Sequence, residues 1–227
     1  MPKGSFPADK DVIFGLCGRK KRVRIYFPYI NFPTVSGLEL DDGALFEPSG
    51  KGVDVICMGD SITHGASADK TSNSWVSRMS RALDVRVINQ GNCGFVYDEA
   101  IIDKVCEPRL VMLSYGTNDI GRKTLEQIKE DTEKFVIKTK ATFPNAKIAA
   151  IIPIWTAWDD GSYPERLEKR QAFKDIYEKY GVFAIDGMKL VPNDPKYFAD
   201  KLVHPDDIGF RYYASRLVRI LRENKLI

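Results

Sequence analysis

Four short segments of this 227-residue chain carry the residue types that acyl transfer requires. They contain Ser61 in Gly-Asp-Ser-Ile-Thr, Gly94 in Asn-Gln-Gly-Asn-Cys-Gly, Asn118 in Gly-Thr-Asn-Asp, and His204 before a proline. Cleaving an ester through a serine needs a nucleophilic hydroxyl, a base that takes its proton, and hydrogen-bond donors for the developing oxyanion. The four segments together therefore indicate a serine nucleophile with an imidazole base.

The chain has only two histidines, so the base must be one of these two. His64 is three residues after Ser61 on the same turn, a poor position from which to pass a proton to a leaving group. His204 comes from a separate loop, so we expect it to face Ser61. The backbone N–H groups of Ser61 and Gly94 and the side-chain amide of Asn118 are the expected oxyanion donors. Gly94 suits this role because a residue without Cβ lets the backbone approach the substrate closely.

The elements that must position these residues alternate between short apolar strands and amphipathic helices. The expected strands span residues 53–59, 85–89, 110–116, 147–154 and 182–186. The expected helices span residues 75–83, 124–143, 164–180 and 208–224. This alternation predicts an α/β fold with a central parallel five-stranded sheet covered on both faces. In such folds ligands bind beyond the carboxyl ends of the strands, so we expect the four segments to meet at one edge of the sheet.

The four segments resemble the conserved blocks of the SGNH hydrolases (GDSL esterases and lipases). Their order and spacing match from about residue 53 to the C-terminus, and four blocks in order are a far more specific signal than Gly-Asp-Ser alone. The resemblance implies a flavodoxin-like three-layer α/β/α sandwich. It also implies Ser61 as the nucleophile, Gly94 and Asn118 as oxyanion donors, and His204 as the base.

One position departs from this family. Its members usually place the triad aspartate three residues before the histidine, where this chain has Lys201, and Asp200 stands four residues before. If the segment forms a helical turn, both positions lie near the histidine, so Asp200 is the expected third member. A Ser–His dyad, or help from Asp186 at the end of the fifth strand, remains an alternative.

The first fifty residues contain short alternating runs in place of the strand and helix alternation of the rest. The runs Arg-Val-Arg-Ile-Tyr-Phe-Pro-Tyr and Leu-Glu-Leu-Asp-Asp-Gly-Ala-Leu-Phe-Glu-Pro predict β-strands joined by a turn. They resemble the end of a β-sandwich module that precedes the catalytic domain in some bacterial carbohydrate acetylesterases of this superfamily. We therefore expect residues 1–50 to form a short N-terminal β-appendage, the remnant of such a module, and residues 51–227 to form the catalytic domain.

The expected substrate is a short acyl ester, acetyl in particular, on a carbohydrate hydroxyl. Trp155 and Trp158 follow the fourth strand, and each could present its ring to a sugar or fill hydrophobic space beneath the loop. The N-terminal resemblance points the same way. The alternatives are a lysophospholipase or thioesterase of the same superfamily, or a carbohydrate-binding protein that has lost turnover.

Composition limits the remaining function classes. The chain has 34 Lys and Arg, 31 Asp and Glu, a net charge of +3 and 44% hydrophobic residues, which argues against disorder, a strongly basic nucleic-acid binder and a membrane surface. The four cysteines are scattered without a Cys-x-x-Cys pair, which favours reduced thiols. Paired acids lack the His and Cys neighbours of a transition-metal site, so we expect neither metal nor cofactor. The expected partner is a small-molecule or oligosaccharide ester, and the oligomeric state stays open.

The compartment follows only from what the chain lacks. No window approaches the roughly 18 uninterrupted apolar residues of a spanning helix. The first ten residues contain no apolar core of a secretory signal. The expectation for the chain as given is therefore cytoplasmic, although a mature exported protein would look the same.

Overall fold

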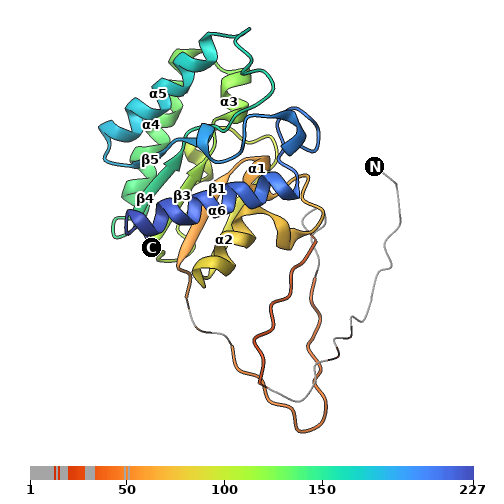
Figure 1. Cartoon of the computed structure of the whole chain (residues 1–227). Coiled ribbons are helices and arrows are strands. Elements are labelled where there is room, and N and C mark those ends of the chain that lie inside the picture. Colours follow the sequence, from red (N-terminus) through yellow and green to blue (C-terminus); the bar gives the residue numbers. More distant parts are fainter. Residues whose placement is uncertain (1–12, 14, 16–19, 29–33, 49, 51) are drawn as a thin grey trace.

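A parallel sheet organises the structure, a computed structural model that describes residues 13, 15, 20–28, 34–48, 50 and 52–227 (Figure 1). Its strands are β1 (Val55–Gly59), β2 (Val87–Gly91), β3 (Leu110–Ser114), β4 (Lys147–Ile151) and β5 (Phe183–Ile185). Within the described residues the five strands lie in the order β2-β1-β3-β4-β5, and every pair is parallel. The predicted α/β fold with a five-stranded parallel sheet is confirmed.

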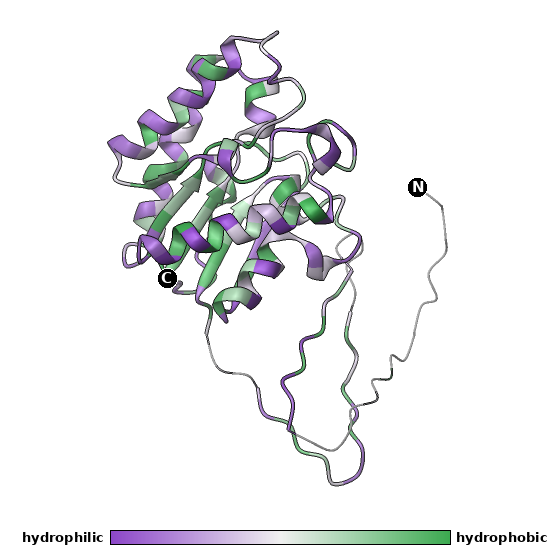
Figure 2. Cartoon of the chain, viewed as in Figure 1, coloured by the Kyte–Doolittle hydropathy of each residue, from purple (hydrophilic) through white to green (hydrophobic). Residues whose placement is uncertain are grey.

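Helices cover both faces of this sheet, because successive side chains of each strand point to opposite sides. Val55 and Cys57 of β1 belong to the hydrophobic cluster under α2 (Trp75–Leu83) and α6 (Asp207–Glu223). Ile56 and Met58 belong to the second cluster, under α4 (Leu125–Thr142) and α5 (Glu165–Lys179). The strands are hydrophobic along most of their length, and the helices alternate hydrophobic with hydrophilic residues (Figure 2). The three layers follow from this division.

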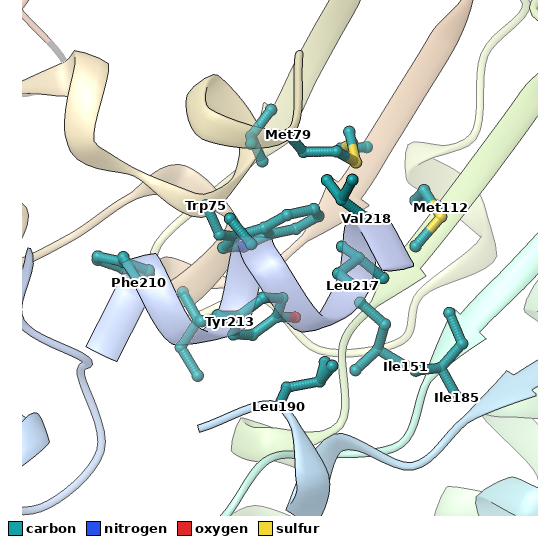
Figure 3. Close-up of a cluster of buried hydrophobic side chains, with 14 of the residues drawn as sticks. Trp75, Met79, Met112, Ile151, Ile185, Leu190, Phe210, Tyr213, Leu217 and Val218 are labelled. Carbon is teal, nitrogen blue, oxygen red and sulfur yellow. The ribbon is translucent and has the colours of Figure 1, made fainter. Parts of the chain in front are cut away.

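Aromatic side chains fill much of the first cluster. The ring of Trp75 on α2 stacks on that of Tyr213 on α6, with centroids 5.0 Å apart. Both rings belong to the same buried cluster as the sheet residues Met112 and Ile151 (Figure 3). This packing joins the two helices that cover this face of the sheet. Within the described part of the chain, no helix combines the length and apolar character needed to cross a bilayer.

Two short helices at the carboxyl edge of the sheet were not anticipated as separate elements. They are α1 (Ser61–His64), directly after β1, and α3 (Thr117–Arg122), after β3. Short 3₁₀ turns also follow: η1 (Thr71–Asn73), η2 (Glu99–Ile101), η3 (Gly187–Lys189) and η4 (Pro195–Tyr197). Helices of this length lack the repeated apolar spacing that makes longer helices recognisable.

The N-terminal segment corrects one expectation. No strand forms in the described residues 20–28 and 34–48, although Asp42 and Gly43 do form the expected turn. A two-stranded unit needs further strands or a helix to bury its apolar face, and Val23, Ile25 and Phe27 remain 46–48% exposed. The segment extends away from the sheet (Figure 1). Residues 1–12 and 29–33 lie outside the described part, and the domain division at residue 50 stays a prediction.

Candidate active site

Ser61 stands at the carboxyl end of the central strand β1. It is the first residue of α1, and its exposed fraction is 8%. Asp60 caps this helix, because its Oδ1 accepts the backbone N–H of Ile62 at 3.0 Å. The turn is too tight for a side chain at Gly59, where a Cβ would overlap the Thr63 hydroxyl. The hydroxyl of Ser61 is thus presented from a rigid strand-to-helix turn.

A hydrogen-bonded chain connects Ser61 to His204 and then to Asp200. Ser61 Oγ lies 2.8 Å from His204 Nε2, and His204 Nδ1 lies 2.6 Å from Asp200 Oδ2. Because a carboxylate only accepts, Nδ1 carries the proton and Nε2 is free to accept the hydroxyl of Ser61. The other histidine, His64, instead places Nδ1 3.0 Å from the carbonyl oxygen of Gly91. The structure therefore brings His204, and not His64, to the serine.

The second carboxylate oxygen of Asp200 fixes the loop that carries the histidine. Asp200 Oδ1 accepts the backbone N–H groups of Leu202, Val203 and His204 at 2.9, 2.8 and 3.1 Å. Burial alone would raise the pKa of Asp200, but these N–H groups and the His204 ring outweigh it and hold the pKa below its usual value. Asp200 therefore stays ionised, as a group that must orient an imidazolium should.

Lys201 explains how an acid four residues before the histidine reaches its ring. Its φ is +61°, in the left-handed region, and its N–H donates to the Phe198 carbonyl oxygen at 3.1 Å. Ala199 N–H donates to the carbonyl oxygen of His204 at 2.8 Å, which closes the loop. This tight turn accommodates the one extra residue between the acid and the histidine, so that Asp200 still reaches the ring. Asp186, the alternative acid, instead accepts the Met188 N–H at 3.1 Å.

The expected oxyanion donors come from the loops after β2 and β3, the two strands that flank β1 in the sheet. The strand register places Gly59 of β1 opposite Gly91 and Ser114, so both loops begin beside the turn that carries Ser61. Gly94 has a φ of +79°, and a Cβ there would meet only the Arg122 guanidinium, at ordinary contact distances of 3.9 and 4.0 Å. Asn118 lies in the first turn of α3. Gly91 serves packing, since a Cβ there would overlap the backbone of His64.

One N–H of the Asn118 amide is already used within the protein. Asn118 Nδ2 donates to the Phe95 carbonyl oxygen at 2.9 Å, which ties the loop after β3 to the loop after β2. An amide nitrogen carries two N–H groups. The second is the one that a substrate oxyanion would take.

Two buried carboxyl groups beneath the site were missed in the sequence, although both stand inside the motifs. Burial raises the pKa of Asp60 to about 7, and the nearby Asp119 carboxyl adds to this effect. Burial also raises the pKa of Asp119, against the effect of the Lys123 ammonium 3.0 Å away. Asp60 caps the turn that carries Ser61, and Asp119 on α3 accepts the Tyr97 N–H of the neighbouring loop.

The two tryptophans after β4 have different environments. Trp155 is only 9% exposed, and its ring centroid lies 5.1 Å from that of Phe198, so the interpretation of Trp155 as a sugar platform is wrong. It fills hydrophobic space under the loop. Trp158 is 42% exposed, with the Arg166 guanidinium 5.9 Å from its ring centroid. The Ala157 N–H donates to the Leu202 carbonyl oxygen at 2.8 Å, so this loop contacts the loop of His204.

A buried ion network, also unanticipated, holds the tryptophan loop in place. Asp159 accepts from Arg166 Nε at 2.7 Å and from Arg170 Nη2 at 2.6 Å. Burial alone would raise the pKa of Asp159, but Arg170 and Arg166 overcome it and lower the pKa to about 2. Arg170 also donates to the carbonyl oxygens of Pro153 and Ile154, just after β4. Across the described residues, no group of three or more His, Cys, Asp and Glu is arranged to hold a metal.

Comparison with known proteins identifies a matching family and several solved structures with a similar fold. The sequence model of the GDSL-like Lipase/Acylhydrolase family matches residues 57–212. No curated protein sequence matches the chain. A member of the lipolytic protein G-D-S-L family from Veillonella parvula is 21% identical with a TM-score of 0.59, over 74% of this chain and 98% of that one.

Two further solved structures with a similar fold are an esterase and an acyltransferase. A psychrotrophic esterase from Pseudoalteromonas sp., inhibited by monoethylphosphonate, is 17% identical with a TM-score of 0.62, over 75% of this chain and 97% of that one. A salicylyl-acyltransferase from a tetracycline biosynthetic pathway is 18% identical with a TM-score of 0.64, over 80% of this chain but 57% of that longer one. At these identities the likeness is one of fold.

Proposed function

Since this chain belongs to the GDSL-like lipase/acylhydrolase family, we propose that it is a serine esterase of short-chain acyl esters. The observation that carries the proposal is the hydrogen-bonded chain from Ser61 through His204 to Asp200. It joins a hydroxyl, an unprotonated ring nitrogen and an ionised carboxylate in the order that nucleophilic catalysis requires.

In the first half of the reaction, His204 Nε2 takes the proton of Ser61 as Oγ bonds to the ester carbonyl carbon. The carbonyl oxygen becomes an oxyanion that accepts from the N–H groups of Ser61 and Gly94 and from Asn118 Nδ2. Asp200 stabilises the imidazolium. When the carbon–oxygen bond to the alcohol breaks, His204 returns the proton to the departing alcohol oxygen.

In the second half, water replaces the alcohol. His204 removes a proton from the water as its oxygen attacks the acyl-serine carbonyl carbon. The carbon–oxygen bond to Ser61 then breaks, and the proton returns to Oγ. The acid is released and the enzyme is regenerated without any redox change. Every proton in this scheme passes through one ring nitrogen that lies 2.8 Å from Oγ.

For the substrate we propose an acetyl ester on a carbohydrate. Trp158 offers a ring 42% exposed on a loop that contacts the loop of His204. An aromatic face of this kind can pack against the apolar face of a sugar. Phe95 and Leu202, 36% and 43% exposed, lie next to Gly94 and two residues from His204 in the chain. They offer apolar surface against which a short acyl group can pack.

The competing functions differ in the acyl group or in turnover. A lysophospholipase or thioesterase would use the same serine with a longer acyl group or a sulfur leaving group. A carbohydrate-binding protein without turnover would not need the continuous hydrogen-bonded chain, which argues against that alternative.

The deciding experiment measures acetate release from a panel of acetylated oligosaccharides, with Ser61→Ala as the blank. We expect release by the wild type and none above background by Ser61→Ala. In parallel, p-nitrophenyl acetate and p-nitrophenyl octanoate compare acyl lengths. A strong preference for octanoate would overturn the short-acyl proposal, and wild-type rates no higher than those of Ser61→Ala would overturn the esterase itself.

A further inference from the structure

Side chains of helix α3 form hydrogen bonds with the backbone of the loop that carries Gly94. Four side chains from this helix and its C-terminal cap contact carbonyl or N–H groups of residues 94–97. The contacts are Asn118 to the Phe95 oxygen at 2.9 Å, Arg122 to the Gly94 oxygen at 2.7 Å, Lys123 to the Tyr97 oxygen at 2.8 Å, and the Tyr97 N–H to Asp119 at 3.0 Å. Each of the pairs Asn118/Arg122 and Asp119/Lys123 is four residues apart, which aligns its members on one side of the helix.

The loop between β2 and η2 has few backbone hydrogen bonds beside these contacts: the Asn92 N–H donates to the Gly59 oxygen at 2.9 Å, and the Phe95 N–H donates to the Asn92 oxygen at 3.3 Å. It contains no regular secondary structure from residue 92 to residue 98. Gly94 lies in the middle of it with a φ of +79°, and glycine has the widest choice of backbone conformations. Among the described residues, the only backbone bond next to Gly94 is the long one from Phe95, so without a further anchor rotation about Gly94 could turn its N–H away from the active site. The bond from Arg122 to the Gly94 oxygen supplies that anchor at the residue itself.

Arg122 differs from its three neighbours in a way that allows it to be tested. Asp119 is buried and Lys123 is half-buried, so changing them would disturb the packing of α3. Asn118 is itself an expected oxyanion donor. Arg122 is exposed, and its guanidinium lies beside Gly94, since a Cβ at Gly94 would stand 3.9 and 4.0 Å from its two terminal nitrogens.

We propose that Arg122 is a positioning residue for the oxyanion site: by holding the Gly94 carbonyl group it restricts rotation about the Gly94 backbone, so that the N–H of the same residue faces the substrate oxygen. This inference rests on the proposed esterase function. Removing an oxyanion donor altogether lowers kcat by about 10²–10³-fold. Loosening one donor without removing it should cost less, and we expect a decrease of about tenfold in kcat. KM should change little, because the oxyanion forms only as the reaction proceeds.

The test compares Arg122→Ala and Arg122→Lys with Arg219→Ala in hydrolysis of p-nitrophenyl acetate. Arg219 is a suitable control because its side chain is 70% exposed on α6, where it pairs only loosely with Glu223 at 3.9 Å. We expect kcat to fall in Arg122→Ala at unchanged KM and unchanged melting temperature. Arg122→Lys should recover part of the rate, because an ammonium can donate to the same carbonyl. Free guanidinium at millimolar concentration should also raise the rate of Arg122→Ala, whereas sodium chloride should not.

Hydrogen exchange of the amides of residues 94–97 provides a readout that does not depend on activity. Exchange should be faster in Arg122→Ala than in the wild type and in Arg219→Ala. A kcat equal to that of the control, or exchange unchanged in Arg122→Ala, would overturn the positioning role. A wild type no more active than Ser61→Ala would overturn the esterase function instead, and that result is recognised before any Arg122 variant is measured.

Discussion

Replacing Asp200 by Asn should abolish most activity while leaving the loop intact. In the wild type, Oδ1 accepts three backbone N–H groups and Oδ2 faces His204 Nδ1. The Asn side chain keeps its oxygen on the three N–H groups, because the opposite orientation would set its NH₂ against three donors. Its NH₂ then donates to His204 Nδ1. The ring must therefore carry its proton on Nε2, where it can no longer accept one from Ser61.

The size of the effect follows from the tautomer and from exposure. In serine proteases the corresponding change lowers kcat about 10⁴-fold. Here the His204 and Asp200 side chains are 29% and 33% exposed, so water can replace part of the lost carboxylate. We therefore expect a decrease of about 10³-fold, equivalent to about 4 kcal/mol at about 1.36 kcal/mol per factor of ten.

The assay is kcat for p-nitrophenyl acetate together with the melting temperature of each variant. Asp186→Asn is the matched control, because Asp186 is the other acid considered and bonds to Met188 instead. It should keep wild-type kcat. Asp200→Ala should lose activity and also melt earlier, since it leaves three N–H groups without their acceptor. If Asp200→Asn keeps more than about a tenth of the wild-type kcat, the reasoning from the tautomer is refuted.

Three further predictions concern stability. Burial raises the pKa of Asp60 from 3.8 to about 7, so the unfolded chain loses this proton at a lower pH than the folded chain does. The wild type should therefore lose stability relative to Asp60→Asn as the pH rises from about 4 to about 7. The difference should reach at most about 4 kcal/mol in urea unfolding and level off above about pH 7, and a flat difference would contradict the raised pKa. Arg170→Ala should lower the free energy of unfolding by about 3 kcal/mol, since it removes one of the two arginine partners of buried Asp159; calorimetry showing no decrease would argue against the network's role. Lys201→Gly should keep the wild-type melting temperature and kcat. Lys201→Val should lower the free energy of unfolding by about 1–2 kcal/mol, because a β-branched residue is strained at positive φ. Equal melting temperatures of the two variants would contradict this.

The fold could be read from the sequence because its signals are local and repeated. Each strand is a short apolar run, and the long helices carry apolar residues at helical spacing. The expected helix at residues 75–83 coincides with α2, and the one at 124–143 differs from α4 by a residue at each end. The missed helix α3 is too short for such spacing. The N-terminal strands were expected from alternation and from the resemblance to a β-sandwich module, but strands also need a partner to pair and pack with.

The sequence by itself determined which groups can do the chemistry: one serine on a tight turn, one histidine on a distant loop, and glycine and asparagine after neighbouring strands. Only the tertiary structure decided which acid serves the histidine, because that depends on the left-handed turn at Lys201 rather than on spacing. It also decided that Trp155 is buried while Trp158 is exposed, and that Arg122 holds Gly94. Residue type sets what a group can do, whereas contacts between segments far apart in the chain set whether it is placed to do it.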